Sequence, residues 1–111
     1  MACNENLSLE VKDVIKYDYL RPFVINNYTE FEGHHNLDSE DFQFSYRTNN
    51  VTSTLSKIEE NASKNGWQRR DLHKKIVSYS KKINIFESKP SLVVVILKIK
   101  KNDDRIYFEV N

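Results

Sequence analysis

The sequence has little of what small extracellular scaffolds, phosphate-binding loops and membrane spans require. Its 111 residues include one cysteine, two glycines and two prolines. A single cysteine excludes an internal disulfide, and so few glycines argue against a Gly-rich phosphate loop. The longest apolar run, Leu92–Leu97, is six residues, whereas a helical membrane span needs ~18. These absences indicate one globular domain over residues 1–111 that folds without covalent staples.

The one cysteine lies near the start of the chain, in Met1-Ala2-Cys3. A small residue before a cysteine resembles the end of a bacterial lipobox, which implies lipidation of Cys3 and an anchor at the cell envelope. The other interpretation is a cytoplasmic protein with a free thiol near its terminus. Under both interpretations, residues 1–6 are expected to be a disordered segment or a tether.

The segment around which the chain is organised is a predicted helix over residues 51–64. Val51, Leu55, Ile58 and Ala62 recur with helical spacing, so they form one apolar face. Asn49 or Asn50 can cap the first turn, and Gly66 supplies a left-handed residue that ends the helix. Trp67 then folds back towards Ala62 and enters the core.

On either side of this helix the hydrophobic period changes to two. Phe42, Phe44 and Tyr46 alternate with polar residues, and strands are expected over residues 67–72, 76–86, 92–99 and 105–110. In residues 92–99 the odd and the even positions, which point to opposite faces of a strand, are both largely apolar. This strand should therefore be covered on both sides near its start. The fold class is therefore α+β: a single antiparallel, or mostly antiparallel, sheet of five or six strands with the amphipathic helix packed on one face. The expected core is Phe44, Val51, Leu55, Ile58, Trp67, Val93, Val95, Leu97, Ile106 and Phe108.

The N-terminal third has weaker patterns. Leu7, Leu9, Val11, Ile15, Tyr17 and Tyr19 all have odd positions, which favours a long strand over residues 7–20, or two short ones broken near Asp13. A helix that uses Leu7, Val11, Val14 and Asp18 fits less well, because a charge falls on its apolar face. Pro22 ends this element, and residues 23–25 are expected to restart a short strand. Residues 26–41 are polar and acidic, which is typical of a long surface loop and makes them the first candidate for a binding element.

No catalytic residue is predicted, because the chain has no GxSxG nucleophile elbow and no activated cysteine. The adjacent His34 and His35, with carboxylates nearby and His73 further along, have the ligand types of a metal-dependent hydrolase. Neighbouring side chains on an extended chain point apart, however, and there is no HExxH motif. We therefore expect no metal site and no cofactor, and keep the hydrolase as an alternative.

Charge is divided along the chain. Residues 1–66 contain six Lys or Arg and eleven Asp or Glu, whereas residues 67–111 contain eleven and five. The basic residues between 69 and 89 suggest binding of RNA or another polyanion as an alternative function. The residues expected to carry it are Arg69, Arg70, Lys74, Lys75, Lys81 and Lys82.

The preferred hypothesis is a non-enzymatic domain that recognises a protein partner, similar to a bacterial envelope lipoprotein or an immunity-type accessory protein. Aromatic side chains among carboxylates in the acidic loop can anchor and steer such a partner. The residues expected to bind it are Tyr28, Phe31, Glu32, His34 and His35.

Overall fold

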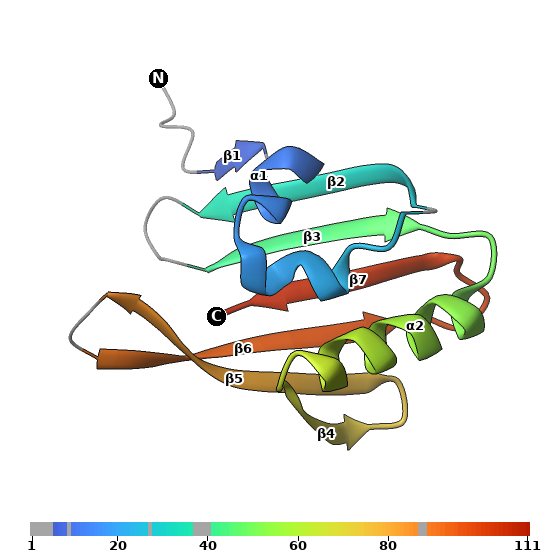
Figure 1. Cartoon of the computed structure of the whole chain (residues 1–111). Helices are drawn as coiled ribbons and strands as arrows, with labels where there is room; N and C mark the ends of the chain where they lie inside the picture. Colours follow the sequence, from blue (N-terminus) through green and yellow to red (C-terminus); the bar gives the residue numbers. More distant parts are fainter. Residues whose placement is uncertain (1–5, 9, 27, 37–40, 87–88) are drawn as a thin grey trace.

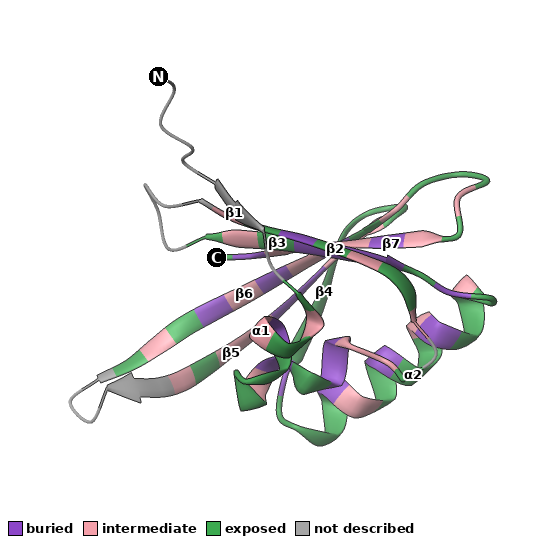
Figure 2. Cartoon of the chain, turned by 90° about the horizontal axis from the view of Figure 1, so that it is seen from above, coloured by how far each residue is buried: buried purple, intermediate pink, exposed green. Residues whose placement is uncertain are grey.

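The computed structural model of this chain describes residues 6–8, 10–26, 28–36, 41–86 and 89–111. Within these residues, seven strands form one sheet and three helical segments lie on one of its faces (Figures 1 and 2). The strands are β1 (Asn6–Ser8), β2 (Thr29–Asn36), β3 (Phe42–Arg47), β4 (Gln68–His73), β5 (Ile76–Phe86), β6 (Lys89–Ile99) and β7 (Arg105–Val110). The helical segments are α1 (Val11–Ile15), the 3₁₀ helix η1 (Asp18–Phe23) and α2 (Val51–Lys64). The predicted α+β class is confirmed, and the short edge strand β1 brings the sheet to seven strands.

The strand order is β1-β2-β3-β7-β6-β5-β4, and each pair of neighbours is antiparallel. The last strand, β7, returns to the middle of the sheet and lies between β3 and β6 (Figure 1). Strands from the acidic first part of the chain therefore form one side of the sheet, and β4, β5 and β6 from the basic second part form the other. The charge division along the sequence becomes a division across the sheet.

The central helix α2 forms as its sequence predicts. The side chain of Asn50 accepts a hydrogen bond from the backbone N–H of Ser53 at 3.0 Å, which caps the first turn. Gly66, at φ 84°, ends the helix, and the N–H of Trp67 donates to the carbonyl oxygen of Ala62 at 3.0 Å. The predicted cap, stop and return of the tryptophan are confirmed.

The core lies between the sheet and the helical layer. Eight of the ten predicted core residues are buried, and the other two, Val51 and Leu55, are half-buried at the edge of α2. The centre is aromatic: the ring of Phe23 lies 4.9 Å from Trp67, 5.4 Å from Tyr79 and 6.3 Å from Phe108, between ring centroids. This space is filled by side chains, which stabilises the helical layer on the sheet.

The prediction of a strand over residues 7–20 is wrong, as is that of a short strand at 23–25. After the three-residue β1, the chain forms α1 and then η1, which ends at Phe23. The backbone N–H of Glu10 donates to the carboxylate of Asp13 at 2.9 Å, which favours a helical turn there. Val14, Leu20 and Phe23 are fully buried, so the segment contacts the sheet through residues that a two-residue period does not select.

The prediction of a surface loop over residues 26–41 is also wrong for half of that range. Residues 29–36 form β2, which pairs with β1 and β3. Its inward positions include Gly33, opposite Phe44, and His35, opposite Phe42, so the usual alternation of apolar and polar residues is hidden. A register shift follows Thr29, and Glu30 adopts φ 48° at this bulge.

The expected tether falls largely on residues 1–5, outside the described residues, and so does Cys3; Asn6 begins β1. Among the residues that the structure describes, no helix is long and apolar enough to cross a membrane.

The helix stop at Gly66 provides a test of the fold. We expect Gly66→Ala to reduce the free energy of unfolding by about 1 kcal/mol, because an L-residue is strained at this positive φ. The added Cβ would lie 3.8 Å from Lys81 Cε, an ordinary contact, so the loss comes from the backbone. Equilibrium urea unfolding measures it, with Ser63→Ala on the exposed side of α2 as the control. An unchanged midpoint for Gly66→Ala would contradict the assigned stop.

Candidate functional site

Among the described residues, the helical segments cover one face of the sheet and none covers the other, as Figure 2 shows; we call the latter the open face. Side chains alternate between the two faces along each strand, and Phe44, Tyr46 and Phe108 point towards the helices. The residues between them in sequence therefore lie on the open face. Across the strands, the register aligns Glu32, Ser45, Tyr107, Lys98 and Ile76 in one row and His34, Gln43, Glu109, Ile96, Ser78 and Arg70 in the next.

An apolar stripe runs along β6 on the open face and consists of Leu92, Val94 and Ile96. Leu92 is 60% exposed, and the other two are half-buried, whereas Val95 on the opposite face is fully buried. The expectation that β6 is covered on both sides is therefore wrong for the chain by itself. The helical layer is large enough to cover only one face, and it leaves these side chains in water. Two features of the sequence could have identified them: residues 92–97 are apolar at odd and even positions alike, and the predicted helix is too short to cover both faces of a sheet.

Beside the stripe, the open face is hollowed to a cavity volume of about 300 Å³. Side chains from β2, β3, β6 and β7 line it, among them Glu32, His34, Ile96, Lys98, Tyr107 and Glu109. Its lining is mixed, with aliphatic and aromatic surface next to charges of both signs. Such a shallow, mixed surface is typical of protein recognition rather than of an enclosed reaction site.

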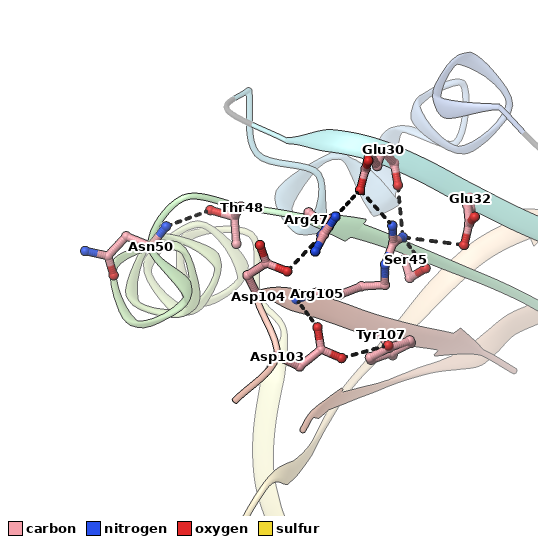
Figure 3. Close-up of polar contacts among 10 residues, drawn as sticks. All are labelled: Glu30, Glu32, Ser45, Arg47, Thr48, Asn50, Asp103, Asp104, Arg105 and Tyr107. Carbon is pink, nitrogen blue, oxygen red and sulfur yellow. Dashed lines mark hydrogen bonds and ion pairs between the residues drawn. The ribbon is translucent and has the colours of Figure 1, made fainter. Parts of the chain in front are cut away.

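A polar network fixes the end of the open face where β2, β3 and β7 meet (Figure 3). Arg47 and Arg105 lie directly opposite each other in the β3–β7 register, and the carboxylate of Glu30 contacts both, at 2.7 and 3.6 Å. Arg105 also donates to the carbonyl oxygen of Glu30 at 2.9 Å and to the hydroxyl of Ser45 at 3.0 Å. The network thereby ties the bulge at Glu30 to the centre of the sheet.

At the same end, Asp103 orients Tyr107. The Asp103 carboxylate accepts hydrogen bonds from the backbone N–H of Arg105 at 2.9 Å and from the Tyr107 hydroxyl at 3.0 Å. These bonds, the backbone bond first, lower the pKa of Asp103, and the bond to Asp103 raises the pKa of Tyr107. Lys100 lies 4.4 Å from the centre of the Tyr107 ring. The ring is therefore held as a fixed part of the open face.

The structure separates the five residues predicted to bind a partner. Tyr28 and Phe31 are half-buried on the helical side, with ring centroids 6.0 Å from Tyr46 and 5.7 Å from Phe44 respectively. His35 is also on this side, 6.2 Å from Phe42. Glu32 and His34 are exposed on the open face and line its hollow. Of the predicted set, only these two lie on the open face.

The histidines considered for a hydrolase do not converge. His34 and His35 point to opposite faces of β2, and His73 lies at the end of the far edge strand β4. In the part of the chain that the structure describes, no group of three or more His, Cys, Asp or Glu side chains is arranged to hold a metal ion.

The six basic residues predicted to bind a polyanion are divided as well. Arg69 forms ion pairs with Glu59 at 2.7 Å and Asp71 at 3.0 Å, and Lys81 donates to the carbonyl oxygen of Asn65, all on the helical side. Arg70 and Lys82 lie on the open face, and Lys74 and Lys75 form the turn between β4 and β5. The six side chains therefore do not form one continuous surface.

Comparison with known proteins gives no relative: no family model, curated protein or solved structure matches this chain.

The two opposed arginines should contribute unequally to stability. Only 14% of the Arg105 side chain is exposed, against 46% for Arg47. We expect Arg105→Ala to reduce the free energy of unfolding by about 2 kcal/mol, because it leaves the Glu30 carbonyl and the Ser45 hydroxyl without this donor. Arg47→Ala is the matched control and should have a smaller effect, since its ion pairs are exposed. Chemical denaturation compares the two; a larger loss for Arg47→Ala would contradict the assignment.

The link between Asp103 and Tyr107 can be measured by titration. Because a neighbouring carboxylate disfavours the phenolate, Tyr107 in the native protein should lose its proton above the ordinary tyrosine pKa of about 10. Replacing Asp103 by Asn removes the charge, so the pKa of Tyr107 should fall towards that value. The ring resonances of Tyr107, followed by NMR against pH, report it. The same pKa in both proteins would exclude this contact.

Proposed function

We propose that this protein is a non-catalytic binding domain that recognises a protein partner through the open face of its sheet. The observation that carries the proposal is the apolar stripe on β6, which the chain leaves uncovered although the strand has the composition of one buried on both sides. A role as an accessory domain of an envelope lipoprotein or of an immunity-type protein fits such a surface.

The surroundings of the stripe support a protein as the partner. Glu32 on β2 and Glu109 on β7 lie on one side of the stripe. Lys98 lies on β6 itself, and Lys82 on β5 and Arg70 on β4 lie on the other side. An apolar centre with a charged periphery is the usual anatomy of a protein interface, in which the centre supplies affinity and the charges supply orientation. The fixed ring of Tyr107 adds a residue type that is frequent in such centres.

A charge placed in the stripe tests the proposal. Ile96→Glu should weaken capture of the cellular partner about 30-fold or more, because a carboxylate would be buried without a counter-charge in the centre of the interface. Leu92→Glu, at a more exposed position, should act in the same direction. Affinity purification from the source cells, followed by binding of the purified partner, measures the effect.

The matched control is Ile15→Glu, the same substitution at an exposed isoleucine of α1 in the helical layer. It should leave binding unchanged, and the thermal midpoints of all three variants establish that each is folded. Full binding by a folded Ile96→Glu protein would show that the open face is not the docking surface.

A further inference from the structure

We infer that the partner on the open face is a second copy of this chain, and that the two sheets pack face to face about a twofold axis parallel to β6 and β7. The inference rests on the proposed function and names the partner of that same surface. Three features support it: the composition of β6, the size of the face and the arrangement of its charges.

Two sheets packed in this way bury the inner side chains of both, in a layer about 10 Å thick. Leu92, Val94 and Ile96 would then be removed from water, as their opposite-face neighbours Val93, Val95 and Leu97 already are beneath the helices. The second sheet would give β6 the cover on both sides that its composition predicts. A second copy supplies this cover by presenting its own open face.

The face is large enough for a stable dimer. The molecule measures 39 × 38 Å in its two long directions and 26 Å in the third, and the sheet extends across the broad dimensions (Figures 1 and 2). A standard protein interface buries about 800 Å² on each partner, which is less than the area that these dimensions allow. The twist visible in Figure 2 is compatible with aligned packing, in which paired sheets cross at about 30°.

The charges on the open face are separated across the strands. The side formed by β2, β3 and β7 has an excess of carboxylates over cations: Glu30, Glu32, Asp103, Asp104 and Glu109 against Arg47, Arg105 and the Lys100 that lies over Tyr107. The side formed by β4, β5 and β6 has Arg70, Lys82 and Lys98. A face with two oppositely charged sides can complement a rotated copy of itself.

This arrangement selects the direction of the axis. An axis between β6 and β7, parallel to them, places β7 of one copy over β6 of the other, β3 over β5 and β2 over β4. Glu32 on β2 then lies on the strand that faces Arg70 on β4. An axis across the strands would instead place each strand over its own copy and oppose like charges. The first axis is therefore the favourable one.

The oligomeric state is measured by sedimentation equilibrium of the purified chain. We expect the wild type and Ile15→Glu to sediment at twice the monomer mass of 13.2 kDa. Ile96→Glu and Leu92→Glu should show at least a 30-fold higher dimer dissociation constant, and both should still unfold cooperatively, with thermal midpoints lowered only by the loss of dimer binding. A wild type that stays monomeric up to millimolar concentration would overturn the inference, and so would folded stripe variants that remain dimers.

Charge-reversal variants on β2 and β4 test the direction of the twofold axis. Glu32→Arg and Arg70→Glu should each weaken the homodimer about tenfold, because each variant opposes like charges across the interface. When the two variants are mixed, both cross-contacts become complementary again, so a heterodimer with wild-type affinity should form. The double variant should recover the homodimer for the same reason. If Glu32→Arg acts only through repulsion of Arg105 within its own chain, mixing will restore nothing and the axis is wrong.

Failure of this inference can be distinguished from failure of the proposed function. A monomeric chain whose capture of a different protein is lost in Ile96→Glu and kept in Ile15→Glu would overturn the homodimer and leave the open face as the docking surface. A stripe variant that changes neither self-association nor capture would overturn both.

Discussion

The packing of Phe23 against Trp67, Tyr79 and Phe108 holds the helical layer on one face of the sheet. The buried Tyr46 hydroxyl donates to the carbonyl oxygen of Phe23 and fixes the end of η1 at the same point. The three helical segments pack on this face, and the side chains between them and the sheet form the buried core (Figure 2). No helix in the described part of the chain covers the opposite face, and the proposed function follows from this difference between the two faces.

The two faces of the sheet have different physical roles, because helices cover one and leave the other open. On the helical side, side chains fill the space between the layers, which stabilises the fold and leaves an aromatic interior. On the open side, the apolar stripe is exposed between an acidic and a basic region. The network around Arg105 and the bond between Asp103 and Tyr107 keep the acidic region in one arrangement before any partner arrives. A surface fixed in this way loses little conformational entropy on binding.

The sequence predicted well those elements whose signals are local. The helix α2 has its cap at Asn50 and its stop at Gly66 within its own residues, and β5 was predicted with the bounds that it has. The N-terminal segment was mispredicted because Ile15 and Tyr17 are exposed while Val14, Leu20 and Phe23 are buried, a choice made by contact with a sheet formed later in the chain. Strand β2 was missed because glycine and histidine occupy its inward positions.

The candidate site could also be predicted only in part, because it depends on how the strands pair. Glu32 and His34 were among the predicted binding residues and do lie on the open face, but Tyr28, Phe31 and His35 lie on the other side of the same strand. A list taken from one stretch of sequence mixes the two faces of a strand, and only the pairing with β3 separates them. The stripe on β6 could be identified as apolar from the sequence, whereas its exposure depends on how much helix the whole chain provides.

If a second copy docks on the open face, a dilution series of the wild-type protein, followed by methyl NMR, will detect it. The methyl resonances of Val94 and Ile96 should shift with protein concentration, while those of Ile15 on the helical layer and Ile58 in the core should stay constant. Resonances of Val94 and Ile96 that are independent of concentration, in a protein of monomer mass throughout the series, would contradict this docking.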